Sequence, residues 1–85
     1  MKEEKLIVSL PEDMDASPVA LLVAEASRFD SRIYLESGNK RVNAKSIMGM
    51  MSFGLANGEE VLVTIDGEDE DDALSAMESF LAHAV

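Results

Sequence analysis

Ser46 is the residue whose type and position most clearly allow chemistry. It comes shortly after Asn43, where a short strand is expected to end, and just before a run of apolar residues. Its hydroxyl can accept a hydrogen bond from a backbone N–H that lacks a partner in the first helical turn, so Ser46 is predicted to be an N-cap. A phosphate on a hydroxyl in this position would change what the surface binds.

Large apolar side chains follow this serine at Ile47, Met48, Met50 and Met51. A core takes only one stripe of such a helix, so some of the four are expected to face solvent. Methionine fills cores, but it is also frequent on surfaces that contact partner proteins. The segment therefore predicts a partner-binding surface beside a hydroxyl that can be modified or, on the plainer interpretation, an ordinary serine cap.

Other residues with chemical potential have simpler explanations. His83, the only histidine, lies near the end of the last expected helix, where a cation suits the helix dipole. The acidic run 66–72 lacks the spacing of an EF-hand and fits the start of a helix. Asp15 and Ser17 are alternative caps for the first helix. We therefore predict no enzyme activity, no metal site and no cofactor.

Composition limits the partners. The chain has 85 residues, 47% of them hydrophobic, and is expected to form a single domain over residues 1–85. It has no cysteine, no signal-peptide pattern and no apolar run of the roughly 20 residues that span a membrane, so a cytoplasmic location is expected. With 17 acidic and 7 basic residues its formal net charge is −10. Such a chain is expected to bind neither nucleic acid nor anionic membranes directly.

Hydrophobic periodicity indicates the elements that position Ser46. Strands are predicted over 5–10, 32–36, 40–43 and 60–66, and helices over 16–27, from Ser46 to before Gly54, and after the acidic run 68–72. The order is β-α-β-β-α-β-α. Strands with one apolar face and short turns predict an α+β fold, in which helices cover one face of a mostly antiparallel sheet.

Apolar stripes indicate the core. The inward positions are expected to be Leu6, Val8 and Leu10; Val19, Leu22, Val23 and Ala26; Val61, Val63 and Ile65; and Ala73, Leu74, Met77, Leu81 and Ala84. A second row on the first helix, Ala16, Ala20 and Ala24, is small and uncharged. If exposed, this row offers a smooth surface that another protein can approach closely.

The segment Asn43-Ala44-Lys45-Ser46-Ile47-Met48-Gly49, with Met51-Ser52 and Asn57-Gly58, resembles the HPr family of bacterial phosphocarrier proteins. The resemblance runs nearly end to end. The segments 25–29 and 67–70 are similar to the branch of the family called Crh, catabolite repression HPr. The resemblance implies an open-faced β-sandwich of four antiparallel strands and three helices, the same architecture that periodicity predicts.

One motif departs from the family. The phosphocarrier motif Gly-Ile-His-Ala-Arg-Pro corresponds to residues 13–18, so Asp15 stands where the family has its phosphorylated histidine and Ser17 where it has an arginine. A carboxylate without a metal or cation does not replace an imidazole, and Asp13 would repel a phosphate placed beside it. We predict that transfer of phosphate from phosphoenolpyruvate is lost.

The regulatory motif is intact. The resemblance implies that HPr kinase/phosphorylase modifies Ser46 and that the phosphoserine form is a corepressor for a catabolite control repressor of the LacI type. The implied partner-binding residues are Ala16, Ser17, Ala20, Val23, Ile47, Met48 and Met51. The chain is expected to be a monomer or weak homodimer. Two alternatives stay open: a residual phosphocarrier that uses Asp15, and a constitutive binding partner that is not phosphorylated.

Overall fold

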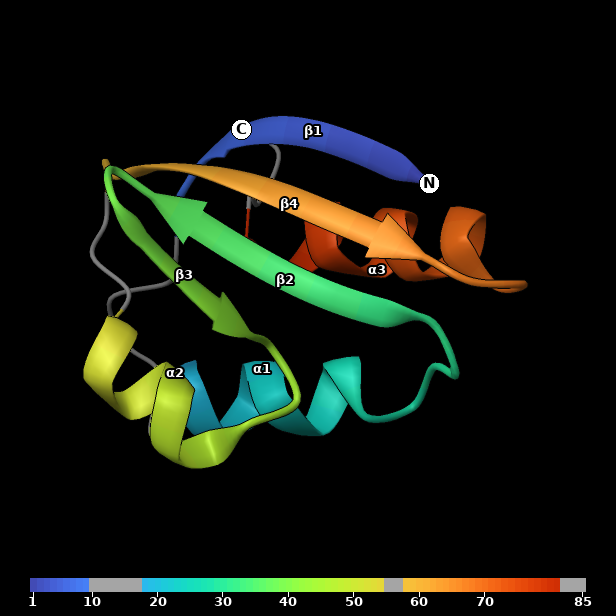
Figure 1. Ribbon diagram of the computed structural model, residues 1–85, viewed down its shortest axis with the longest axis horizontal. Coiled ribbons are helices and arrows are strands. Elements are labelled where there is room, and N and C mark those ends of the chain that lie inside the picture. The colour runs from blue at the N-terminus through green and yellow to red at the C-terminus, as the bar shows by residue number, and fades with distance from the viewer. Residues whose placement is uncertain (10–17, 55–57, 82–85) are drawn as a thin grey trace.

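A four-stranded antiparallel sheet, in the order β1-β4-β2-β3, forms one layer of the protein (Figure 1). The computed structural model describes residues 1–9, 18–54 and 58–81. The elements are β1 (Lys2–Ile7), α1 (Pro18–Ala26), β2 (Arg32–Ser37), β3 (Lys40–Asn43), α2 (Ile47–Phe53), β4 (Glu60–Asp66) and α3 (Glu70–Leu81). These helices lie on one face of the sheet and leave the other face open (Figure 1). The predicted α+β open-faced sandwich is confirmed.

The core lies between the sheet and the helices. Successive side chains of a strand point to opposite faces, so alternate apolar residues of each strand reach this layer. The buried strand residues are Leu6, Ile33, Leu35, Val61, Val63 and Ile65, and the buried helix residues are Leu22, Ala26, Met50, Ala73, Met77 and Leu81. The predicted stripes are thus largely confirmed, although Val19, Val23 and Leu74 are only half-buried at its margin. Leu10 and Ala84 lie outside the described residues.

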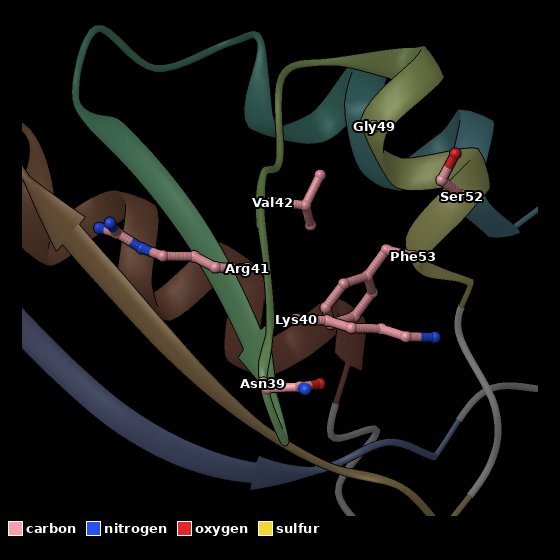
Figure 2. A pocket seen from close by; sticks show the side chains of 7 residues that line it. All are labelled: Asn39, Lys40, Arg41, Val42, Gly49, Ser52 and Phe53. Carbon is pink, nitrogen blue, oxygen red and sulfur yellow. The ribbon is translucent and has the colours of Figure 1, made fainter.

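Helix α2 packs closely on the neighbouring edge strand β3 because its first turn carries Gly49 (Figure 2). A Cβ at this position would lie 2.6 Å from Cγ2 of Val42 and 3.2 Å from Oγ of Ser46. The absence of a side chain therefore sets how near the helix approaches the strand. The helix ends at Phe53, and Gly54 follows with φ 71°, so the predicted glycine stop is confirmed.

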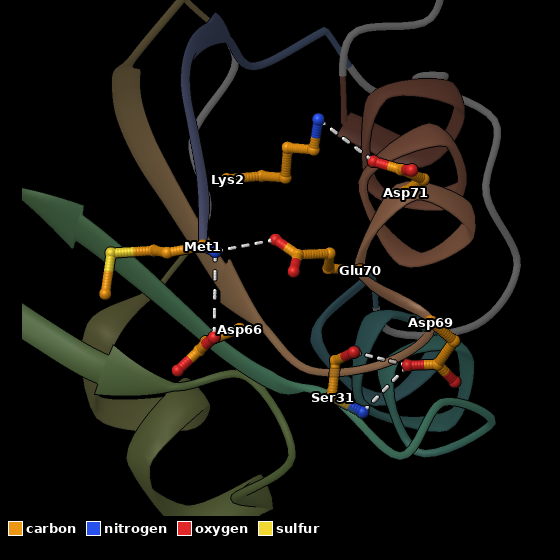
Figure 3. A network of polar contacts seen from close by, with 7 residues as sticks. All are labelled: Met1, Lys2, Ser31, Asp66, Asp69, Glu70 and Asp71. Carbon is orange, nitrogen blue, oxygen red and sulfur yellow. Dashed lines mark hydrogen bonds and ion pairs between the residues drawn. The ribbon is translucent and has the colours of Figure 1, made fainter.

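The first strand begins and ends earlier than predicted. The expected span was 5–10, whereas β1 runs from Lys2 to Ile7 and pairs along β4. The polar start of β1 is compatible with a strand because its inward lysine reaches α3: Lys2 Nζ lies 3.1 Å from a carboxylate oxygen of Asp71 (Figure 3). Hydropathy alone missed the start of this strand because residues 2–5 are polar and their position is set by backbone pairing with β4.

The Asp69 side chain connects the segment before α3 to the segment before β2 through hydrogen bonds (Figure 3). Its carboxylate accepts 2.9 Å hydrogen bonds from the backbone N–H groups of Asp30 and Ser31 and a further bond from the Ser31 hydroxyl. The hydroxyl bond is the main cause, and the backbone bonds a further cause, of an Asp69 pKa below its usual value of 3.8. Ser31 is the buried polar residue among those described. The acidic run was predicted only to favour the helix dipole, and this tertiary role of Asp69 was not predicted.

Candidate functional site

A hydrogen-bonded turn after β3 places Ser46 at the start of α2. The backbone N–H of Lys45 donates to Oδ1 of Asn43 at 2.8 Å, and the N–H of Ser46 donates to the Asn43 carbonyl at 3.0 Å. An asparagine that accepts from the residue two positions later stabilises a turn of this kind. Asn43 is therefore a positioning residue for Ser46. The sequence carried the signal, since an Asn-X-Lys-Ser segment follows an expected strand, but its side-chain bond was not predicted.

Ser46 is the N-cap of α2, as predicted. Its backbone is extended, with φ −96° and ψ 110°, and its Oγ accepts a hydrogen bond from the N–H of Gly49 at 3.2 Å. The residue is exposed. An exposed hydroxyl at the beginning of a helix is accessible to a modifying enzyme, and added negative charge there is compatible with the helix dipole.

The apolar residues after Ser46 divide between core and solvent. Met50 is 0% exposed and packs in the core, whereas Ile47 is 44%, Met48 79% and Met51 70% exposed. The expectation that some of the four face solvent is confirmed. We call Ile47, Met48 and Met51 the methionine patch. It borders an exposed hydroxyl on the same short helix, so one partner can contact both.

Helix α1 packs against α2 and adds its own surface. Ala20 is exposed and Val23 half-buried, so both are partly accessible as the predicted surface requires. The predicted helix 16–27 is observed as α1 from Pro18 to Ala26, with Ser27 in the following turn. Asp15, Ala16 and Ser17 lie outside the described residues, so their predicted roles stay predictions.

Lys45 is anchored to the protein backbone. Its Nζ donates a 2.5 Å hydrogen bond to the carbonyl oxygen of Phe29, in the chain that follows α1. The lysine is half-buried, and its bond joins the segment before α2 to the segment after α1. This long-range contact was not predicted, because nothing in the local sequence distinguishes Lys45 from a solvated lysine.

The described residues contain no cluster of three or more His, Cys, Asp or Glu side chains that could hold a metal ion. None of the helices within the described ranges is both long and apolar enough to cross a bilayer. His83 lies outside those ranges. The exposed Ser46 hydroxyl beside the exposed methionine patch supports modification and docking chemistry.

This fold and this serine motif define a class of bacterial phosphocarrier-related proteins. Residues 2–83 match the family described as PTS HPr component phosphorylation site. The chain belongs to the HPr family.

The relatives specify the branch. The chain is 44% identical to HPr-like protein Crh of Bacillus subtilis (strain 168) over 85 residues, which is 100% of both proteins. Its structure is similar to the phosphocarrier protein HPr from Bacillus anthracis str. Ames, with a TM-score of 0.85 and 40% identity over 94% of this chain and 95% of that chain. It is also similar to crystalline Crh from Bacillus subtilis, with a TM-score of 0.74 and 44% identity over 100% of this chain and 98% of that chain. The protein is therefore a Crh-like member of the family.

Proposed function

We propose that this protein is a regulator of carbon catabolite repression in which phosphorylation of Ser46 is the switch. HPr kinase/phosphorylase adds the phosphate, and the phosphoserine form is a corepressor for a LacI-type catabolite control repressor. The observation that supports this most directly is the exposed Ser46 hydroxyl beside the exposed methionine patch. The likeness to HPr-like protein Crh supports the choice of pathway. The protein acts by binding, in the cytoplasm, and is not an enzyme.

The phosphate changes the surface more than the fold. It adds about −1.5 to −2 charge and three acceptor oxygens at a helix start that favours negative charge. A partner arginine can pair with these oxygens while the methionine patch fills an apolar groove on the partner. Both the phosphate and the methionine patch are needed for a switch. An exposed ion pair with the phosphate is weak alone, and the methionine patch is present in the phosphorylated and the unphosphorylated protein alike.

Modification is tested by mass spectrometry after incubation with HPr kinase and ATP. We expect one phosphate on the wild-type protein and none on Ser46→Ala. An unmodified wild-type protein would refute the proposal and favour a constitutive partner.

Docking is tested by repressor binding to the phosphorylated protein. Met48→Asp should abolish binding, because Met48 is largely exposed and the change leaves the core intact. Ile7→Asp is the matched control: Ile7 is also exposed, but it lies on the open face of the sheet, since its neighbours Leu6 and Val8 are buried. Equal binding by the Met48 and Ile7 variants would show that the patch is not the interface.

We further propose that the chain does not transfer phosphate from phosphoenolpyruvate, because Asp15 replaces the histidine of the phosphocarrier motif. Incubation with enzyme I and phosphoenolpyruvate should leave it unlabelled. Label on Asp15 would overturn this.

The protein is proposed to be a monomer or weak homodimer. Crh from Bacillus subtilis crystallised as an intertwined dimer with a swapped domain, and this likeness supports the dimer. Sedimentation velocity over a range of concentrations tests it, and a tight dimer at all concentrations would contradict it.

A further inference from the structure

An open groove runs between β3 and α2 (Figure 2). Its lining residue Ser52 follows Met48 of the methionine patch by four positions, so the groove and the patch are neighbours on the surface of α2. The groove has a cavity volume of about 490 Å³, within the range of roughly 300–1,000 Å³ common for ligand sites. It is lined by Asn39, Lys40, Arg41, Val42, Gly49, Ser52 and Phe53. Val42 and Phe53 form the apolar floor of the groove, and both side chains are held in place because they also pack against the core.

Successive side chains of a strand point to opposite faces, so only one of the two neighbouring cations of β3, Lys40 and Arg41, directs its side chain toward the groove. Lys40 and Val42 project toward α2, whereas Arg41 projects to the opposite face of the sheet (Figure 2). There the Arg41 guanidinium lies 4.4 Å from the centre of the Tyr34 ring and 3.7 Å from a Glu36 carboxylate oxygen. Arg41 therefore contributes backbone to the groove, and the Lys40 ammonium contributes the charge.

Lys40 is also unusual among the cations of this acidic chain. Lys2 and Lys5 pair with the carboxylates of Asp71 and Glu60. Within the described ranges, Lys40 is exposed and has no acidic partner. Arg32 and Lys45 also lack one, but Arg32 lies on the open face of the sheet, since the next residue, Ile33, is buried inward, and the Lys45 ammonium donates to the Phe29 carbonyl. A chain of net charge −10 thus presents, among its described residues, an ammonium without a carboxylate partner beside apolar side chains.

We infer that this groove binds an extended segment of a partner protein that presents a carboxylate beside an apolar side chain. The carboxylate pairs with Lys40, and the apolar side chain packs on Phe53 and Val42. Asn39 and Ser52 supply polar groups at the rim for the backbone of the segment. A single lysine with an apolar floor suits a carboxylate better than a phosphate, which is commonly held by several donors. The groove adjoins the methionine patch on α2, so we assign the segment to the same partner; only this assignment rests on the proposed function.

A blocked dipeptide tests the groove without the repressor. N-acetyl-Leu-Glu-amide is titrated into the ¹⁵N-labelled, unphosphorylated protein, and amide resonances are followed. We expect saturable shifts at Lys40, Val42, Gly49 and Ser52 with a Kd on the order of 1 mM. N-acetyl-Leu-Lys-amide and acetate alone should give no such shifts. Equal shifts with either would overturn the inference, and so would concentration-dependent shifts at the same amides without peptide, which would indicate a second copy of the chain.

Two lysine variants test whether the Lys40 ammonium is the charge that binds the carboxylate of the dipeptide. Lys40→Met should weaken dipeptide binding at least tenfold, whereas Lys5→Met, an exposed lysine on another strand, should leave it unchanged. Equal binding by the two variants would refute the role of Lys40. Unchanged thermal unfolding of both variants verifies that the fold is intact.

The partner assignment is tested with the phosphorylated protein and the repressor. Lys40→Glu should reduce repressor affinity about tenfold through like-charge repulsion, whereas Lys5→Glu should not. If the wild-type phosphoprotein fails to bind the repressor, the proposed function is wrong. The dipeptide titration still tests independently whether the groove binds a carboxylate beside an apolar side chain. If the repressor binds the Lys40→Glu and wild-type phosphoproteins equally, the assignment of the groove to this partner is wrong.

Discussion

Replacement of Gly49 by alanine has two opposite effects on the free energy of unfolding: a gain from backbone entropy and a loss from steric overlap with Val42. Alanine in a helix interior is favoured over glycine by about 0.5–1 kcal/mol, because glycine loses more backbone entropy on folding. The added Cβ, however, would lie 2.6 Å from Cγ2 of Val42. Val42 is β-branched and stiff, so the overlap must be relieved by moving the helix from the strand. Overpacking of this kind costs about 1–3 kcal/mol.

The clash should exceed the entropy gain. We expect Gly49→Ala to reduce the free energy of unfolding by about 1–2 kcal/mol. For a chain of this size that corresponds to a fall in Tm of roughly 4–16 °C. Thermal unfolding followed by circular dichroism at 222 nm measures the change.

A double-mutant cycle isolates the contact with Val42. In a Val42→Ala background the offending Cγ2 is absent, so Gly49→Ala should become neutral or stabilising. A destabilisation by Gly49→Ala of the same size in both backgrounds would refute the contact as the cause. An increase in stability from Gly49→Ala in the wild-type background would refute it more directly.

Three further predictions follow from the described contacts. Ser46→Ala should lower the free energy of unfolding by about 1 kcal/mol in urea titrations, because the cap of α2 is lost; an unchanged midpoint would contradict this. Met50→Ala should cost about 2–5 kcal/mol and Met48→Ala less than about 0.5 kcal/mol, because only Met50 is buried, and a reversed order would show that α2 faces the other way. The Asp69 pKa is lower in the folded than in the unfolded state, so its ionised form stabilises the fold above pH 3.8, and this contribution disappears as the pH falls through the folded pKa. The Tm difference between wild type and Asp69→Asn should therefore shrink below about pH 4, and a difference that does not vary with pH would contradict the role of the carboxylate.

Local patterns were sufficient for most of the fold. Alternation over Glu60–Asp66 predicted β4 with its observed bounds, and Ser46 and Gly54 marked the limits of α2 correctly. These signals are local: a strand with one buried face, a hydroxyl cap and a glycine stop act within a few residues. The notable error, the span of β1, occurred where backbone pairing with the distant strand β4 decides the outcome.

The roles of individual residues in the site were predicted, but the long-range hydrogen bonds that connect the site to the rest of the fold were not. The exposure of Met48 and the capping role of Ser46 followed from residue type and helical spacing. The bonds of Lys45 to Phe29 and of Asp69 to Ser31 span separations of 16 and 38 residues, which no local pattern reports. The lack of an acidic partner for Lys40 among the described residues was not predicted for a related reason, because whether a lysine has a partner depends on which strands and helices become neighbours.

The anchorage of Lys45 has a consequence for any phosphate carried by the next residue. Its ammonium already donates to the carbonyl of Phe29, so it is directed away from the role of internal counter-ion. A phosphate on Ser46 would therefore lack its neighbouring lysine as a counter-ion. This leaves the phosphate open to pair with cations of a partner protein, so that the association of the two proteins can depend on the phosphorylation of one serine.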